Sequence, residues 1–180
     1  IDQRIWDLFG ERWAVMFTDL SGFSRNVERF GIVHFLQVIY EAEYRLLPII
    51  ESHDGIVLKV EGDSFLVIFR NPEKAIAASI AMQRLLEQHN RGVPVEEQVL
   101  LCVGLGCGDV LRIGDEDVFG VEVNSASKLG EDIAEPWDIL VTENLRDLAL
   151  TVDGVTGAEP LGEVPSGVGS AYRLGYDRGG

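Results

Sequence analysis

The sequence predicts an α+β fold: a ferredoxin-like βαββαβ core with α-β additions, in which one sheet carries helices on one face. Three observations predict it. Short apolar runs that look like buried strands alternate with longer stretches of helical periodicity. Two of these runs are separated by a four-residue turn, which indicates a hairpin. Along the chain the order is strand, helix, strand, strand, helix, strand, and further helical and strand segments follow.

A strand and a long helix form the first part of this core. Residues 1–11 are mixed and amphipathic, and we expect them to be the end of an upstream linker or helix. Residues 12–19 (RWAVMFTD) form a strand, which LSGFS ends. Apolar residues then recur at helical spacing, so we expect a helix that stops at Gly55. The stripe consists of Ile32, Phe35, Leu36, Ile39, Ala42, Leu46, Ile49 and Ile50.

The hairpin and a second helix follow. Residues 56–60 (IVLKV) and 65–69 (FLVIF) are two strands joined by EGDS. The next helix is expected over residues 71–90, because Asn71 is a favourable N-cap and Pro72 suits the first helical position.

The remaining elements are a long strand and the additions to the core. The strand covers residues 99–113 and is loosened by its glycines. A helical segment over 123–133 and a short strand over 138–142 come next, and a turn-rich tail ends in a last strand over 171–174.

Composition excludes some classes of protein. The 180 residues include 30 acidic and 15 basic ones, giving a formal net charge of −15. A nucleic-acid-binding surface would need a basic patch, so we expect no nucleic-acid partner. Metal-bridged binding of a nucleotide stays compatible with this charge. No apolar run approaches the roughly 20 residues of a membrane span, so we expect no membrane insertion of this segment.

The two cysteines indicate a reducing compartment. Cys102 and Cys107 are five residues apart in one strand, which places them on opposite faces and prevents pairing. Two thiols without a histidine cluster do not form a zinc site. We therefore expect a cytoplasmic location, either for a free protein or for the cytosolic part of a larger or membrane-attached one.

An acidic pair points to metal chemistry. The first strand ends at Asp19, the hairpin turns at Asp63, and the predicted topology brings them to one edge of the sheet. Two carboxylates with nearby carbonyls can hold one or two Mg²⁺ ions, which suits phosphoryl chemistry. Gly22 and Gly62 would let the backbone approach a phosphate.

Simpler interpretations of these residues exist. Asp63 is also a common turn residue, and Asp19 can cap a helix. Lys59 stands within an otherwise apolar strand. It either extends its ammonium to solvent or directs it at a ligand or a carboxylate.

Four segments together resemble the class III nucleotidyl cyclase catalytic domain. They are FTDLSGF (17–23), LKVEGDSF (58–65), DVFGVEVNSASK (117–128) and the closing LGEV…GVGSAYRL, which extends the resemblance over about residues 12–174. The resemblance assigns residues 12–180 to one catalytic domain of ferredoxin-like fold. It also implies a homodimer with composite sites at the interface, and an upstream regulatory domain in the full-length chain.

The resemblance also implies roles in metal and base binding. Asp19 and Asp63 match the metal-binding aspartates, joined by the Leu20 carbonyl, and each site would hold two Mg²⁺ or Mn²⁺ ions. Lys59 and Asp117 match the pair that reads the purine. A lysine donating to N1 and an aspartate accepting from the 6-amino group select adenine, and guanine would leave both groups unsatisfied.

Further positions follow from the same motifs. Asn124 matches the asparagine that orients the ribose, and Gly22 and Phe23 fall in the substrate-binding part of the first motif. The implied enzyme is an adenylate cyclase: the ribose 3′-hydroxyl of ATP attacks the α-phosphate, and cyclic AMP and pyrophosphate form.

The chain departs from the family at the polyphosphate end. Lys128 stands where the family usually has the arginine that stabilises the transition state, and Cys102 replaces another arginine. The tail offers Pro165, Ser166 and Val168 where a family lysine contacts phosphate, and Arg112 is a candidate substitute. We therefore expect low activity.

Two alternatives remain. The first is a catalytically degraded cyclase-homology domain that binds nucleotide or dimerises in signalling. The second is a diguanylate cyclase, which EGDSF loosely suggests and which the other motifs disfavour.

Overall fold

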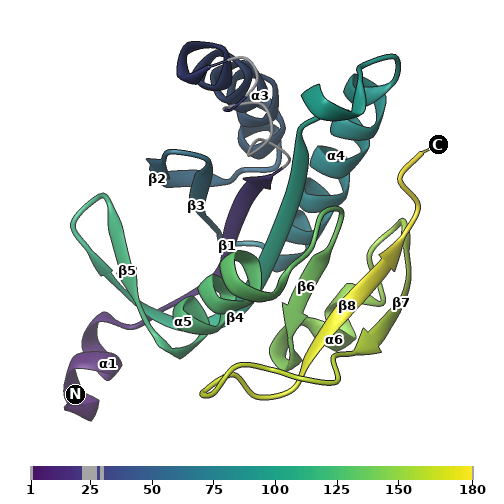
Figure 1. Cartoon of the computed structure of the whole chain (residues 1–180). Helices are drawn as coiled ribbons and strands as arrows, with labels where there is room; N and C mark the ends of the chain where they lie inside the picture. The colour runs from purple at the N-terminus through teal and green to yellow at the C-terminus, as the bar shows by residue number, and fades with distance from the viewer. Residues whose placement is uncertain (1, 22–27, 29–30, 180) are drawn as a thin grey trace.

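The computed structural model describes residues 2–21, 28 and 31–179. Its centre is one eight-stranded sheet with the order β2-β3-β1-β4-β6-β8-β7, and β5 pairs with β4 outside that path (Figure 1). The core elements are β1 (Glu11–Ser21), α3 (Ile32–Ser52), β2 (Ile56–Glu61), β3 (Ser64–Phe69), α4 (Pro72–Asn90) and β4 (Leu100–Ile113). Because their sheet order is β2-β3-β1-β4, the predicted α+β class and ferredoxin-like core are confirmed.

Helix α4 begins and ends at the predicted residues. The Asn71 side chain accepts a hydrogen bond from the Glu73 backbone N–H (2.9 Å), as an N-cap does. At the other end, the Asn90 amide donates to the Val99 carbonyl (2.8 Å) and accepts from the Val99 N–H (3.2 Å). This buried pair of bonds fixes the end of α4 to the start of β4.

The register around β1 brings the acidic positions together. β1 is antiparallel to both β3 and β4, and Asp19 lies opposite Ser64 on one side and Cys102 on the other. Just beyond, the Leu20 N–H donates to the Asp63 carbonyl at 3.0 Å. The Asp63 turn relies on Gly62, whose φ of +58° is a left-handed conformation that favours glycine.

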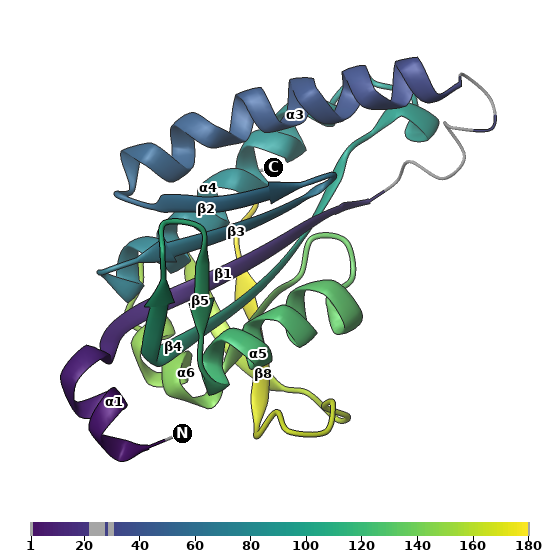
Figure 2. The same ribbon diagram turned by 90° about the vertical axis from the view of Figure 1, so that its left-hand side faces the viewer.

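Helices cover both faces of the sheet, which corrects part of the prediction. Alternate residues of β1 pack on opposite faces: Ala14 and Met16 join the core under α3 and α4. Trp13 and Val15 join a second core with residues of α5 (Val121–Ser127). Figure 2 shows α3 and α5 on opposite sides of the sheet. The one-face expectation therefore holds for α3 and α4 and is wrong for α5.

Glycines in β4 explain why α5 can lie on the second face. A Cβ added at Gly104 would lie 2.3 Å from the Gly130 nitrogen and 2.5 Å from the Ala126 carbonyl oxygen. One added at Gly106 would lie 2.6 Å from the Glu122 carbonyl oxygen. These glycines therefore admit a closely packed helix backbone, where the sequence suggested only a loosened strand.

The additions contain elements that the sequence did not predict. Strands β6 (Ile139–Thr142) and β8 (Ala171–Tyr176) match the prediction, and the segment expected to be helical is α5 followed by a π-helix, η2 (Lys128–Ile133). Helix α1 (Gln3–Phe9) lies in the segment expected to be the end of an upstream linker or helix. The unpredicted elements are η1 (Val95–Glu97), β5 (Asp117–Phe119), α6 (Glu143–Ala149) and β7 (Val155–Pro160). Of the helices described, none is both long enough and apolar enough to cross a membrane.

Both cysteines are buried and unpaired. Cys107 packs in the core under α3 and α4, and Cys102 lies opposite Asp19. Burial, and then the negative charge of Asp19, raise the pKa of Cys102 to about 11. The thiols are therefore protonated core groups, as expected.

Candidate functional site

A β-bulge in β2 places Val57 and Lys59 on opposite faces of the sheet. The pairing of β2 with β3 shifts register between Val57 and Lys59. Val57 packs on the core under α3 and α4, so strict alternation would direct Lys59 to that face. Instead, the extra residue turns Lys59 and Glu61 to the opposite face, where both line a cavity. Val60 lines a different cavity beside α3.

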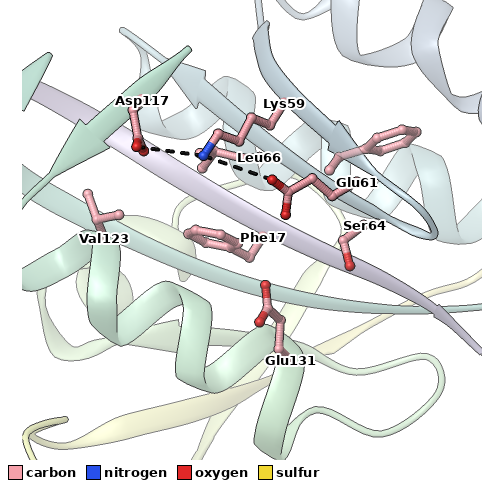
Figure 3. Close-up of a pocket in the computed structure, with 9 residues that line it drawn as sticks. Phe17, Lys59, Glu61, Ser64, Leu66, Asp117, Val123 and Glu131 are labelled. Carbon is pink, nitrogen blue, oxygen red and sulfur yellow. Dashed lines mark ion pairs between the residues drawn. The ribbon is translucent and has the colours of Figure 1, made fainter. Parts of the chain in front are cut away.

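Lys59 and Asp117 form an ion pair in this cavity of about 130 Å³ (Figure 3). The Lys59 Nζ lies 3.6 Å from Asp117 Oδ2. The other oxygen, Asp117 Oδ1, accepts a hydrogen bond from the Val118 N–H at 3.0 Å, which fixes the carboxylate. The apolar lining consists of Phe17, Phe65, Leu66 and Val123. A cavity with apolar walls and a few polar groups that include the Lys59–Asp117 pair suits a planar heterocycle.

Asp19 and Asp63 form a second pair, between β1 and the β2–β3 turn. Burial raises the pKa of Asp19 to about 6, and the charge of Asp63 and a hydrogen bond with its carboxyl group contribute to the increase. A hydrogen bond from Ser64 Oγ, 3.5 Å from Asp19 Oδ1, acts in the opposite direction. Two partly buried carboxyl groups are thus held together against their repulsion.

A divalent cation fits this acidic pair. Two carboxylates in contact bind a proton more tightly, and a cation relieves the same repulsion. In the described part of the chain, no group of three or more His, Cys, Asp or Glu residues is arranged to hold a metal ion. The metal ligands available here are therefore the carboxylates of Asp19 and Asp63 and a backbone carbonyl oxygen. Leu20, the residue after Asp19 in β1, is the candidate for that carbonyl.

The π-helix brings a third carboxylate to the site. Glu131 lies in η2 and lines the cavity of Lys59 from the side opposite Glu61 (Figure 3). Burial raises its pKa, and the charges of Asp132, Glu61 and Asp63 add to the shift. Glu131 in turn raises the pKa of Asp19. It therefore interacts electrostatically with the Asp19–Asp63 pair and also lines the cavity that holds the Lys59–Asp117 pair.

Glu43 adds negative charge behind Asp63. It is a buried residue of α3 and lines a cavity of about 340 Å³ with Gly62 and Asp63. Its Oε1 has no hydrogen-bond partner in the part of the chain that the structure describes. Burial, followed by the charge of Asp63, raises its pKa.

Asn124 and Lys128 lie outside the cavity. Asn124 is exposed on α5, and Lys128 follows one turn later at the start of η2. The Lys128 ammonium donates a hydrogen bond to the Ser166 carbonyl oxygen at 2.7 Å. Arg112, the alternative cation, has its guanidinium 5.6 Å from the centre of the Trp13 ring. Gly22 and Phe23 lie outside the described residues.

The sequence motifs therefore fall into separate groups within one chain. Lys59 meets Asp117, and Asp19 meets Asp63, as the motifs suggested. Glu61 and Glu131 were missed. The signal for Glu61 was its spacing of two from Lys59 in a strand, whereas Glu131 depends on a π-helix that no residue pattern announces.

Comparisons with known proteins show the family of the chain. A family model described as the adenylate and guanylate cyclase catalytic domain matches residues 10–159. The serine/threonine-protein kinase pkn2 of Myxococcus xanthus is 31% identical over 151 residues, which is 84% of this chain and 18% of that protein. A putative adenylate cyclase 3 of Rhizobium meliloti is 29% identical over 134 residues, 74% of this chain and 22% of that protein.

These curated relatives are thus about five times longer than the part they share with this chain. Among solved structures, the adenylyl cyclase CyaB from P. aeruginosa has the same fold, with a TM-score of 0.76 at 23% identity. The match covers 94% of this chain and 96% of that one. Because the family model covers most of the sequence, the chain belongs to the family of adenylate and guanylate cyclase catalytic domains.

Proposed function

We propose that the chain is an adenylate cyclase domain that converts ATP to cyclic AMP and pyrophosphate. The observation that carries this proposal is the Lys59–Asp117 pair, 3.6 Å apart at the rim of an apolar cavity. In this proposal Lys59 donates to adenine N1 and Asp117 accepts from the 6-amino group. Guanine in the same position would present an acceptor, O6, to Asp117 and a donor, N1–H, to Lys59. Of adenine and guanine, this pair of residues therefore selects adenine.

The acidic pair is the proposed metal site. Asp19, Asp63 and the Leu20 carbonyl would hold two divalent cations, Mg²⁺ or Mn²⁺. When bound, such ions lower the pKa of the ribose 3′-hydroxyl and stabilise charge on the phosphates. Asn124 would orient the ribose, and Gly22 and Phe23 would border the triphosphate. Lys128 would hold negative charge that develops at the α-phosphate, without the paired contacts of an arginine.

We also propose a homodimer with composite sites. In this arrangement Asp19 and Asp63 of one protomer face Lys59, Asp117 and Asn124 of its partner. Exposed apolar side chains on the elements that carry or flank these groups support such an interface. On α3 and β2 they are Ile32, Val33, Leu36, Tyr40, Tyr44, Ile56 and Val60, and near β5 they are Ile113, Phe119 and Val121.

The surrounding protein and its location are part of the same proposal. The short match to long curated relatives supports a regulatory domain elsewhere in the full-length chain. Two reduced, buried cysteines support a cytoplasmic site of action.

Product identification tests the proposal. The purified domain is incubated with ATP or GTP and Mn²⁺, and the products are separated by chromatography. We expect cyclic AMP from ATP, abolished by Asp63→Ala. Cyclic GMP as the main product, or cyclic AMP that persists in Asp63→Ala, would contradict it.

A degraded, nucleotide-binding domain is the second candidate. The observation that favours it is the bond between Lys128 and Ser166, because it engages the one cation of the DVFGVEVNSASK motif with the protein itself. Binding of ATP without any product at high protein concentration would favour this candidate.

A further inference from the structure

Glu61 shares the cavity with Lys59 and Asp117 and has no role in the function proposed above. Its Oε1 lies 4.0 Å from Lys59 Nζ, and Asp117 Oδ2 lies 3.6 Å from the same nitrogen. In Figure 3 the ammonium lies between the two carboxylates. The rim of the cavity therefore presents an acceptor, a donor and a second acceptor in a row.

The bulge explains why this row exists. After the register shift, Lys59 and Glu61 are two residues apart in β2 and direct their side chains to the same face. The side chain of Glu61 is 76% exposed, whereas that of Lys59 is 36% exposed. The Glu61 carboxylate thus has room to move toward a base that is bound against Lys59.

The Watson–Crick edge of a purine also carries three groups in a row, at position 6, N1 and position 2. Adenine has an amino group, an acceptor and a C–H at these places. If its 6-amino group meets Asp117 and its N1 meets Lys59, position 2 is directed toward Glu61. A donor at position 2 would then complete the third contact.

We propose that Glu61 reads position 2 of the purine, so that the pocket binds a 2-amino-substituted adenine nucleotide more tightly than ATP. This inference rests on the proposed contacts of Lys59 and Asp117 with adenine. The favoured base is 2,6-diaminopurine, whose donor, acceptor and donor match the acceptor, donor and acceptor of the protein. Adenine leaves Glu61 facing a C–H group.

The same three groups, Asp117, Lys59 and Glu61, can also bind guanine, but with lower affinity. Shifted by one position, guanine directs O6 at Lys59, and its N1–H and 2-amino group donate to Glu61. Asp117 is then left without a donor. GTP therefore binds more weakly than ATP but depends on Glu61 for what affinity it has.

Equilibrium binding tests the proposal. Dissociation constants for ATP, for the triphosphate of 2,6-diaminopurine riboside and for GTP are measured by calorimetry with Mn²⁺, in the unmodified chain and in Glu61→Leu. We expect the diaminopurine nucleotide to bind about threefold to tenfold more tightly than ATP, a modest factor for a bond to a charged but exposed group. In Glu61→Leu the two nucleotides should bind equally, and GTP should weaken further.

Glu131→Gln is the matched control, because it removes one negative charge from the opposite side of the cavity. We expect it to keep the preference for the diaminopurine nucleotide, whatever it does to both affinities. Equal binding of the two nucleotides by the unmodified chain, or a preference that survives in Glu61→Leu, would overturn the role of Glu61.

The outcomes separate this inference from the proposed function. Cyclic AMP formation without the preference rejects Glu61 alone. The preference without any cyclic product rejects the cyclase activity alone. Failure of all three nucleotides to bind rejects both.

Discussion

The carboxylate of Asp63 lies close enough to Asp19 to change the pKa of Asp19. Burial and the charge of Asp63 together raise the pKa of Asp19 to about 6, from a usual value of 3.8. Between these two values the folded chain keeps a proton that the unfolded chain has lost. The stability of the metal-free domain therefore falls as pH rises through this window.

Metal binding should show the same titration. A cation at this pair must displace the proton, so we expect the affinity for Mn²⁺ to fall about tenfold per pH unit below about pH 6 and to level off above it. Calorimetric titrations with Mn²⁺ between pH 4.5 and 8 measure this.

Asp63→Asn is the control for this titration. It removes the repelling charge, so the metal-free melting temperature at pH 7.5 should rise while Mn²⁺ affinity drops. Affinity that is independent of pH in the unmodified chain would show that the ion binds elsewhere.

Lys128 is a second residue whose chemistry can be tested by substitution. Arginine keeps the charge and adds a planar pair of donors for a phosphate, so we expect Lys128→Arg to raise kcat by about tenfold with a small change in KM. Steady-state rates of cyclic AMP formation from ATP measure it. Lys128→Met should abolish turnover, and a Met variant as active as the unmodified chain would exclude this role.

Single residues show where sequence reasoning succeeded. Asp19, Asp63, Lys59 and Asp117 stand in motifs, and two pairs of them meet in the structure. Glu131 belongs to no such motif. Its position depends on how η2 packs, which is a tertiary effect that local pattern does not encode.

At the scale of elements, the close approach of α5 and η2 to β4 fixes the geometry of the second face. Long, strongly periodic segments such as α3 and α4 were predictable, because their apolar stripes specify both type and extent. The short additions were not. The three-residue strand β5 gains its structure by pairing with β4, and the seven-residue helix α6 by packing on β4 and β6.

This close approach predicts the effect of one methyl group. In Gly104→Ala the new Cβ would meet backbone atoms of Gly130 and Ala126, which cannot rotate away. We expect the free energy of unfolding to fall by about 1–3 kcal/mol, as for other overpacked sites. Urea denaturation followed by circular dichroism measures it.

The matched control is Gly157→Ala in β7, where an added Cβ meets no atom within 4 Å. Its effect should stay within about 0.5 kcal/mol. Equal losses of unfolding free energy in the two variants would mean that the close packing of α5 and η2 on β4 is not the reason why position 104 requires glycine.

At the scale of the whole molecule, each site of the proposed dimer combines the Asp19–Asp63 pair of one protomer with the Lys59–Asp117 pair of its partner. If it is correct, a mixture of Asp63→Ala chains and Lys59→Ala chains contains heterodimers with one intact site. We expect each variant alone to be inactive, and the mixture to regain up to about a quarter of the unmodified rate, because half of the dimers are mixed and each has one of two sites. Cyclic AMP formation as a function of mixing ratio measures it.

Chain association must be verified in the same samples by sedimentation. Two folded, dimeric variants whose mixture stays inactive would contradict the composite site.

The bulge in β2 has a consequence for how relatives of this chain are compared. In an alignment, one missing residue between positions 57 and 59 looks like a trivial length difference beside a well-matched GD turn. In the molecule the turn keeps Lys59 paired with Leu66, so the shorter strand would keep its lysine on the cavity face and would turn Val57 away from the core under α3. Counting the residues ahead of that turn therefore shows whether the start of the strand can pack under α3 while the lysine two residues later faces the opposite side of the sheet.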